Sequence, residues 1–284
     1  MKKRILIPTD FSKNAWNALN YATTLYKDEE CTFFLLNAYQ LYHFTTDSII
    51  TPEPGEKSFE EAKATSEKGL EDLLDGLQST ADNSRHTFEM ISVYNNVLNA
   101  VKEIIKSKEI NLVVMGTKGE GNPMNALYGS NAVTIIENVK KCPILVIPEI
   151  SKSPEVAKAE IVFATNFKYY YKRRELATLV DIASKLNAPI RILNINGDRK
   201  ITDEQEGNKE LLTEYFEGID HSFHTLTNIS VAPGIHAFME SRSSTILALY
   251  NRKHGFFSAL FTSSLVKELS ESPQFPILVL QEHH

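Results

Sequence analysis

Three short segments of the chain carry residue types that suit the binding of an anion. They are Pro8-Thr9-Asp10, Met115-Gly116-Thr117-Lys118-Gly119 and Gly129-Ser130-Asn131. Glycine lets the backbone approach a ligand closely and adopts positive φ angles without strain, so a side chain at Gly116 or Gly129 would invade the ligand's space. Gly129 and Ser130 precede a predicted helix, whose free N–H groups and dipole attract phosphate. The spacing therefore predicts a phosphate-binding loop.

The charge of Asp10 suggests a different role for that residue. A carboxylate that faced phosphate groups directly would repel them. Asp10 is therefore expected to accept hydrogen bonds from sugar hydroxyls or to hold a metal ion. The hydroxyl of Ser130, in contrast, can donate to a phosphate oxygen. A nucleotide presents both groups, and the three segments together favour a nucleotide site.

Alternating strands and helices must bring these segments together. In the N-terminal half the predicted strands are residues 4–8, 32–37, 87–93, 112–115 and 144–147. The predicted helices are residues 14–26, 58–77, 97–107 and 131–139. Continuous apolar runs such as Ile144-Leu145-Val146-Ile147 are typical of parallel strands covered on both faces. Alternating βαβ units predict an open parallel sheet, in which ligands bind beyond the carboxyl ends of the strands at the topological switch point.

The N-terminal pattern recurs in the second half of the chain. Residues 161–167 (IVFATNF) match residues 5–11 (ILIPTDF), and residues 276–280 match residues 143–147. Repeats of this length indicate a duplicated domain. The second copy is shorter, and residues 39–58, rich in turn and aromatic residues, are the predicted place of the difference.

We therefore predict two tandem α/β domains, residues 1–150 and residues 158–284, joined by a linker over residues 149–158. The predicted strands of the second domain are residues 161–164, 190–195, 223–227, 245–249 and 277–280. The last strand of each domain is apolar, and an exposed apolar edge strand invites pairing. The two domains are expected to form an intramolecular pseudo-dimer through these last strands, and a further homodimer remains an alternative.

The glycine pattern, together with the opening run Ile7-Pro8-Thr9-Asp10-Phe11-Ser12, resembles the ATP-binding class of universal stress proteins. The resemblance covers residues 1–150 and, in degenerate form, about residues 158–281. It implies Rossmann-like, flavodoxin-like domains with five-stranded parallel sheets of order 3-2-1-4-5. It implies ATP, or ADP or AMP, as the ligand, with Mg²⁺ expected. The implied contacts are Pro8, Thr9, Asp10 and Ala38 for adenine or ribose, Met115 and Gly116 for the nucleoside, and Gly119, Gly129, Ser130 and Asn131 for the phosphates.

The second domain departs from this pattern. The replacements are Tyr250 for Gly116, Lys253 for Gly119, Thr262 for Gly129 and Asn166 for Asp10. A tyrosine side chain where the backbone must approach phosphate would block the site. Nucleotide binding is therefore expected in the first domain only, with the second as a ligand-free structural partner. Binding of some other anion by residues 252–254 (RKH) remains an alternative.

Composition narrows the possible functions. The formal net charge is −6, and neither half has the basic field that non-specific nucleic-acid binding requires. No run of about 20 apolar residues predicts a transmembrane helix, so a cytoplasmic protein without membrane contact is expected. Cys31 and Cys142 lie beside apolar runs and are expected to be buried, reduced thiols. The terminal His283-His284 can be native or the remnant of a tag.

Other candidate sites are weaker. The pair His221 and His224 is expected on a strand, where positions three apart face opposite sides, so a zinc site is disfavoured. His236 is expected on the surface of a helix. The aromatic and basic residues 169–174 favour a solvated face over a nucleic-acid patch. No Ser-His-Asp, Cys-His or paired-carboxylate arrangement has a recognisable context.

The leading hypothesis is a stress-response regulatory protein that binds ATP with little or no hydrolysis and acts on an unidentified protein partner. An interaction module that does not depend on nucleotide is the alternative from another class. A slow ATPase that uses Asp10, Lys118 and bound Mg²⁺ is a third, but no residue is positioned as a base for water. An enzyme of the related adenine-nucleotide hydrolase superfamily is disfavoured because residues 8–12 (PTDFS) are not rich in glycine.

Overall fold

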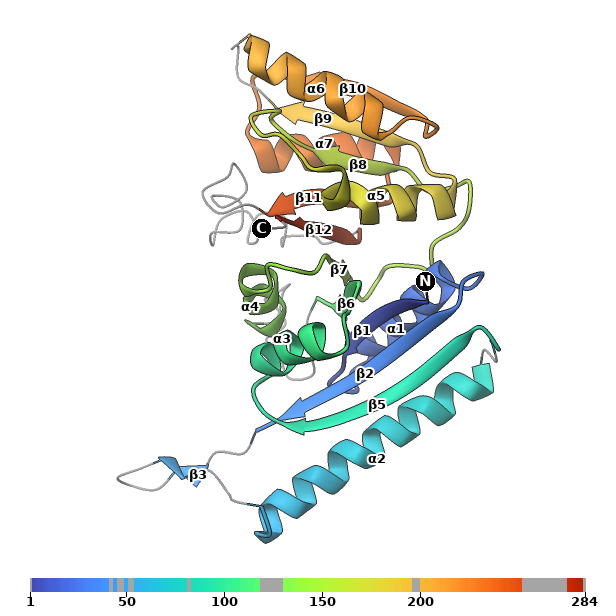
Figure 1. The fold of residues 1–284 in the computed structure, drawn as a ribbon, viewed down its shortest axis with the longest axis vertical. Coiled ribbons are helices and arrows are strands. Elements are labelled where there is room, and N and C mark those ends of the chain that lie inside the picture. Colours follow the sequence, from blue (N-terminus) through green and yellow to red (C-terminus); the bar gives the residue numbers. More distant parts are fainter. Residues whose placement is uncertain are drawn as a thin grey trace.

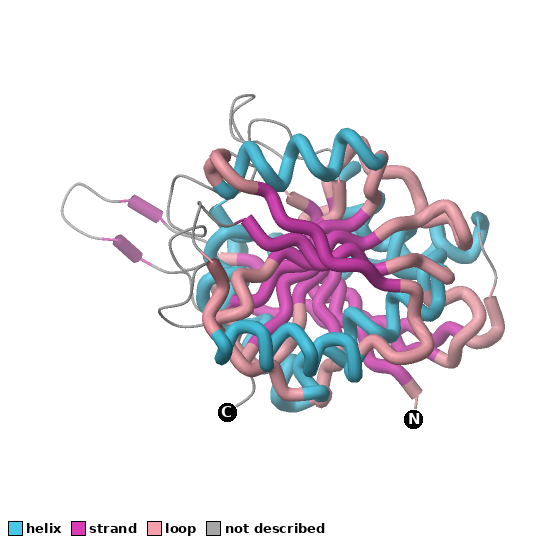
Figure 2. The backbone as a smooth tube through the Cα atoms, turned by 90° about the horizontal axis from the view of Figure 1, so that it is seen from above, coloured by secondary structure: helices cyan, strands magenta, loops and turns pink. Residues whose placement is uncertain are grey.

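The computed structural model describes residues 2–40, 43–44, 49–50, 54–80, 83–117, 130–195, 200–251 and 275–282. One ten-stranded sheet runs through the molecule, with helices on both faces (Figures 1 and 2). Its strand order is β10-β9-β8-β11-β12-β7-β6-β1-β2-β5. The first five strands of this order belong to the C-terminal half of the chain and the last five to the N-terminal half.

Within the N-terminal half of this sheet all neighbouring strands are parallel. The strands are β1 (Lys3–Pro8), β2 (Cys31–Tyr39), β5 (His86–Tyr94), β6 (Leu112–Gly116) and β7 (Ile144–Ile147). The helices are α1 (Lys13–Leu25), α2 (Lys57–Thr80), α3 (Val97–Ser107) and α4 (Ser130–Asn138). The order β5-β2-β1-β6-β7 is the predicted order 3-2-1-4-5 when these five strands are numbered along the chain.

The C-terminal half repeats this arrangement with a shorter outer edge strand, since β10 has 6 residues and β5 has 9. Its strands are β8 (Ile161–Ala164), β9 (Ile190–Ile195), β10 (His221–Leu226), β11 (Ile246–Asn251) and β12 (Ile277–Gln281). Its described helices are α5 (Arg173–Leu186), α6 (Asp203–Tyr215) and α7 (Val231–Arg242). The order β10-β9-β8-β11-β12 is again 3-2-1-4-5, and all of these neighbours are parallel.

The two halves meet where β7 pairs with β12 in antiparallel direction. The register places Leu278 opposite Leu145, with both side chains fully buried. This pairing confirms the predicted contact between the last strands of the two repeats. It joins two parallel sheets into one sheet and covers an apolar edge strand on each side.

A polar cluster between helices also links the halves. Lys3 on β1 forms an ion pair with Asp181 on α5, and Lys185 of α5 bridges Asp181 and Glu29. The buried hydroxyl of Tyr26 donates to the Asp181 carboxylate at 3.3 Å. Burial, followed by the charge of Asp181, raises the pKa of Tyr26 well above its usual value.

Each face of the sheet has its own apolar core. Helices α1, α2, α5 and α6 cover one face, and α3, α4 and α7 cover the other. Because both faces are covered, the central strands are apolar throughout, and all four residues of β7 are buried. Cys31 and Cys142 are buried and are not joined in a disulfide, as expected, and burial raises the pKa of Cys31 to about 11.

The N-terminal half contains a short addition where the length difference was expected. Strands β3 (His43–Phe44) and β4 (Ile49–Ile50) form a two-residue antiparallel pair between β2 and α2. Helix α2 is also long, with 24 residues. Among the described residues, no helix has the length and apolar character that a membrane span would need.

Candidate functional site

The topological switch point of the N-terminal half lies between β1 and β6. The strands pair at Ile5–Leu112 and Leu6–Val113, so their carboxyl ends leave the same edge of the sheet side by side. From β1 the chain enters α1 on one face, whereas from β6 it proceeds to α4 on the other face. Chains that diverge in this way open the crevice in which doubly wound α/β sheets bind ligands.

The end of β1 is a tightly bonded turn. The N–H of Thr9 donates to the Leu36 carbonyl at 2.8 Å, which extends the pairing with β2. The Thr9 hydroxyl accepts from the Phe11 N–H at 3.0 Å, and the Asp10 carboxylate accepts from the Ser12 N–H at 3.2 Å. Ser12 then caps α1 by accepting from the Ala15 N–H. These bonds fix the backbone of Asp10 while its side chain stays exposed at the strand edge.

Phe11 has a left-handed backbone, with φ of 65°. Its ring lies against Gly69 of α2, where an added Cβ would be 2.5 Å from the ring carbons. Because this glycine leaves room for the ring, α2 holds Phe11 beside the crevice. Phe11 remains 36 % exposed there.

A buried asparagine on β2 ties the turn to the sheet. The Asn37 side chain is 9 % exposed, and its amide donates to the Thr9 carbonyl at 2.8 Å. Ala38 follows it on β2 and is half-buried, level with the end of β1. The structure thus brings Pro8, Thr9, Asp10 and Ala38 to one edge of the sheet, as the sequence predicts.

The end of β6 is packed against α1. Asn14, 3 % exposed, donates from its side-chain amide to the Thr117 hydroxyl at 3.1 Å. A Cβ added to Gly116 would lie 2.8 Å from Cγ and Nδ2 of Asn14. Gly116 is therefore required by the packing of the protein itself, a role that the sequence did not predict. The side chain of Met115 is 7 % exposed and belongs to the core on the α3 and α4 face.

The predicted phosphate segments are described only in part. Gly119 and Gly129 lie outside the described residues. Ser130 is the first residue of α4, and Asn131 is exposed in its first turn. The start of α4 therefore has the helical geometry that the sequence predicts for residues after Gly129.

A family model for the universal stress protein family matches residues 1–148. The chain belongs to this family. A universal stress protein of Methanocaldococcus jannaschii is 26 % identical over 150 residues, which are 53 % of this chain and 84 % of that protein. Membership of the family supports a role in the stress response.

Solved structures show that the tandem arrangement also occurs elsewhere. A universal stress protein of Archaeoglobus fulgidus superposes with a TM-score of 0.66 at 19 % identity, covering 98 % of this chain and 96 % of that chain. A putative universal stress protein of Pseudomonas aeruginosa gives a TM-score of 0.63 at 14 % identity, covering 99 % and 93 %. At these identities the likeness establishes the fold.

The C-terminal half of this universal stress protein keeps the first turn of the site. Thr165 accepts from the Phe167 N–H at 3.1 Å, and Asn166 accepts from the Lys168 N–H at 3.1 Å. These bonds match those of Thr9 and Asp10. Phe167 also has a left-handed backbone, with φ of 57°. The backbone bonds require only a side-chain oxygen, so asparagine replaces aspartate without changing the turn.

The strand that corresponds to β6 carries a bulky side chain in this half. Strand β11 pairs with β8 at Ile161–Ile246 just as β6 pairs with β1 at Ile5–Leu112, so Tyr250 holds the position of Gly116. Tyr250 is 3 % exposed, and its ring packs edge-on against Tyr171 with centroids 4.9 Å apart. The Tyr171 hydroxyl lies 2.6 Å from the Thr165 hydroxyl. Two buried aromatic side chains thus pack at the end of β11, where the corresponding strand β6 ends in a glycine. Lys253 and Thr262 lie outside the described residues, as does the remainder of the segment 252–254.

His221, His224 and His236 have local partners. His221 and His224 lie on β10 with a carbonyl and a hydroxyl as partners, those of Ile219 and Ser222, each at 2.8 Å. His236, on α7, lies 3.4 Å from Glu240. No group of three potential metal ligands occurs among the described residues.

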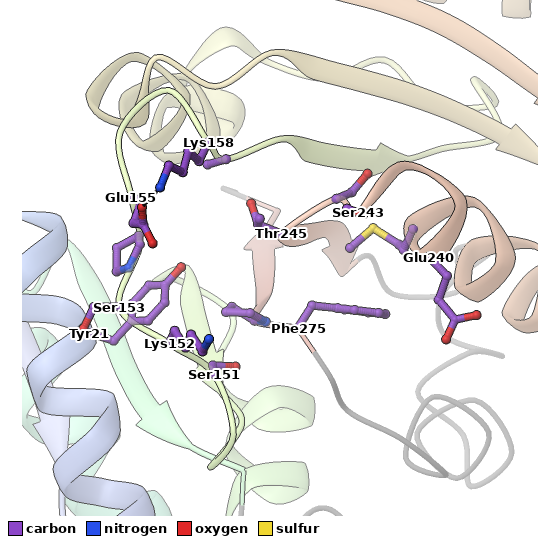
Figure 3. Close-up of a pocket in the computed structure, with 15 residues that line it drawn as sticks. Tyr21, Ser151, Lys152, Ser153, Glu155, Lys158, Glu240, Ser243, Thr245 and Phe275 are labelled. Atoms are coloured by element: carbon purple, nitrogen blue, oxygen red, sulfur yellow. Dashed lines mark ion pairs between the residues drawn. The ribbon is translucent and has the colours of Figure 1, made fainter.

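A cavity of about 520 Å³ lies between the linker and the C-terminal half. Tyr21 of α1, Lys152 and Ser151 of the linker, and Thr245 and Phe275 at the starts of β11 and β12 surround it (Figure 3). Its lining mixes apolar, hydroxyl and charged groups. Two of its charged side chains, Lys158 and Glu155, pair with each other at 2.5 Å. The lining does not select one class of ligand.

Proposed function

We propose that this universal stress protein binds one adenine nucleotide, in the crevice between β1 and β6, and acts as a regulatory protein of the stress response. The observation that carries the proposal is the difference between the two switch points. Both halves share the turn after their first strand, but only the N-terminal half combines an exposed carboxylate at Asp10 with a glycine at the end of the neighbouring strand. In the C-terminal half Tyr250 and Tyr171 occupy that region.

The residues present fit an adenine nucleotide. Asp10 can accept hydrogen bonds from ribose hydroxyls, and the edge formed by Pro8, Thr9 and Ala38 offers backbone groups and apolar surface to the base. The start of α4 directs N–H groups toward bound phosphates, aided by Gly119, Gly129, Ser130 and Asn131. Mg²⁺, when bound with the nucleotide, supplies further neutralisation of phosphate charge. Residues 1–150 would form the nucleotide-binding domain and residues 158–284 its ligand-free partner.

We infer that the protein binds ATP without rapid turnover. Helix N–H groups and hydroxyls neutralise the charge of bound substrate and of the transition state about equally, so they favour binding over catalysis. Efficient phosphoryl transfer needs a positioned nucleophile and a cationic clamp at the γ-phosphate. In the described residues of the crevice, Asp10 is the ionisable side chain at the strand edge, and its backbone bonds suit a holding role. A phosphate-release rate below about one per minute is expected, far below the roughly 10 per second of typical enzymes.

Binding is tested by titration calorimetry with Mg-ATP on protein stripped of nucleotide. About one site per chain is expected, and Asp10→Asn should weaken binding about fivefold, because hydrogen bonds to a charged acceptor are roughly twice as strong as neutral ones. The natural Asn166 indicates that Asp10→Asn preserves the turn. Asn166→Ala is the control in the other half. It removes the side-chain oxygen that accepts from the Lys168 N–H, and it should leave the ATP affinity unchanged. Two equal sites, or no binding at millimolar ATP, would refute the proposal.

Mass spectrometry of nucleotide that co-purifies with the native protein would identify the ligand directly. Recovery of ATP, ADP or AMP supports the proposal. If no nucleotide is recovered, the result favours the alternative, a nucleotide-independent interaction module. A phosphate-release rate above one per second that Asp10→Ala abolishes would make the protein an ATPase.

A further inference from the structure

A side chain from the C-terminal half bonds directly to helix α4 of the N-terminal half. Asn251, the last residue of β11, donates from Nδ2 to the carbonyl oxygen of Ile136 at 3.0 Å. The same amide donates to Oε1 of Gln281, the last residue of β12, at 3.1 Å. Asn251 is 6 % exposed, Gln281 2 % and Ile136 4 %, so the contact is sealed from water.

Ile136 lies in the last turn of α4. The last four carbonyls of a helix have no N–H donor within the helix, so their hydrogen-bond donors must come from elsewhere. Helix α4 has only nine residues, and a helix that short does not persist in water without tertiary contacts. A buried amide at its C-terminal end therefore contributes to holding the whole helix.

Asn251 holds the position in β11 that Thr117 holds directly after β6. In the N-terminal half this position is bonded inward, since Thr117 accepts from Asn14 of α1. In the C-terminal half the corresponding residue is bonded outward, across the junction between the halves. The end of β11, which has Tyr250 in the position of Gly116, thus contacts helix α4 of the other repeat through Asn251.

The orientation of the amides is set by the same bond. The Nε2 atom of Gln281 is buried and has no hydrogen-bond partner among the described residues. Turning the Gln281 amide over would set that donor against Nδ2 of Asn251. Asn251 consequently has its two donor contacts, one to Gln281 and one to Ile136, fixed on opposite sides of the junction.

We propose that Asn251 is a positioning residue for the nucleotide site: it anchors the C-terminal end of α4, whose N-terminal end faces the phosphates. This inference rests on the proposed function. It makes the C-terminal half part of the binding mechanism although its own switch point is filled. Binding at the N-terminal end of α4 and the contact at Ile136 then stabilise the same short helix, and each favours the other.

The test compares Asn251→Leu with Asn208→Leu, a matched control in the same half. Asn208 is also buried and also donates its amide to a backbone carbonyl, that of Phe167 at 2.9 Å, but it lies on α6 and bonds to the turn after β8 rather than to α4. Asn251→Ser, whose hydroxyl is too short to span the same distance, is the second variant if the leucine disturbs folding. Circular dichroism establishes that each variant is folded.

Two measurements are made on the full chain: hydrogen–deuterium exchange of the amides of residues 131–139 without ligand, and calorimetric titration with Mg-ATP. Asn251→Leu is expected to speed exchange in α4 and weaken ATP binding at least fivefold, equivalent to about 1 kcal/mol at 1.4 kcal/mol per tenfold change. Asn208→Leu should leave both within twofold of the wild type. An unchanged ATP affinity in folded Asn251 variants, with a wild type that binds, overturns the inference alone. A wild type that binds no ATP overturns the proposed function and this inference together.

Discussion

Replacing Gly116 by alanine tests the packing at the end of β6, where the protein's own structure requires a glycine. The added Cβ would lie 2.8 Å from Cγ and Nδ2 of Asn14 and 3.1 Å from its Oδ1. Asn14 is 3 % exposed, so its side chain has no solvent to move into. The substitution must therefore displace Asn14 and break its 3.1 Å bond to the hydroxyl of Thr117, which is 1 % exposed.

The expected cost follows from these two effects. Leaving buried polar groups without partners costs about 1–3 kcal/mol. Forcing an extra carbon into a packed site costs about 1–3 kcal/mol more. We expect the free energy of unfolding to fall by about 2–6 kcal/mol, which lowers Tm by roughly 4–24 °C at about 2–4 °C per kcal/mol.

Differential scanning calorimetry on Gly116→Ala, Asn14→Ala and the double variant measures the effect. Removing the Asn14 side chain also removes the clash, so the second substitution should cost less in that background, with a coupling of at least about 1 kcal/mol. If Gly116→Ala melts within 1 °C of the wild type (about the resolution of the assay), or if the two costs add, Asn14 is not the obstacle and the reasoning fails. A wild-type Tm for Gly116→Ala would exclude packing as the reason for this glycine and would leave ligand binding as the proposed reason.

Three further outcomes are expected. Gly207→Ala should raise the free energy of unfolding by about 0.5–1 kcal/mol, because this glycine lies within α6 and an added Cβ meets nothing within 4 Å; a lower Tm would contradict this. Tyr250→Gly should cost about 3–5 kcal/mol of packing and still give one ATP site by calorimetry; a second site would mean that Tyr250 alone closes the C-terminal half. Burial raises the pKa of Glu160, but hydrogen bonds from Arg242 and Arg191 outweigh this and lower it to about 2, so its stabilisation is complete above pH 4.5 and is lost as the pH falls toward 2. Glu160→Gln should lower the free energy of unfolding by about 1.5–3 kcal/mol at pH 7, and urea titrations should show a smaller loss of stability over that acid range. An unaltered pH profile would show that the ion pairs of Glu160 with the two arginines do not contribute to stability.

The alternation of strands and helices could be read from the sequence because each strand is an apolar run bounded by turn residues. Helix α3 and strands β7, β8 and β9 have the predicted ends, since a clear cap or apolar boundary marks each. The ends of β2 and β5 were underestimated, because Tyr39 and Tyr94 continue a ladder that depends on the neighbouring strand.

The sequence correctly placed Pro8, Thr9, Asp10 and Ala38 at one edge of the sheet, since strand ends can be located from apolar periodicity. That they contact a nucleotide stays a prediction. The asparagines that build the site were missed. Asn14 and Asn37 interrupt otherwise apolar positions, which is the one signal that could have marked them as buried and bonded. Their partners are distant in sequence, so no local pattern identifies what they bond.

The C-terminal half shows which parts of the first turn depend on backbone geometry and which do not. The left-handed residue and the two side-chain oxygens survive in Thr165, Asn166 and Phe167, because the chain must still turn from β8 toward α5. The negative charge, which the turn does not need, is absent there. Under the proposed function, the charge of Asp10 serves the ligand, because a carboxylate can accept hydrogen bonds from sugar hydroxyls or hold a cation.

The junction between the halves gives the C-terminal half a structural role that does not depend on a ligand. All four residues of β7 are buried, and β12 supplies the strand that covers its open edge. Without β12 that edge would expose unpaired backbone groups beside apolar side chains, a surface prone to association. At the second switch point Tyr171 and Tyr250 pack against each other, and this aromatic contact does not depend on a ligand. The C-terminal half can in this way support β7 and α4 continuously; under the proposed function, nucleotide occupancy would change only at the N-terminal half.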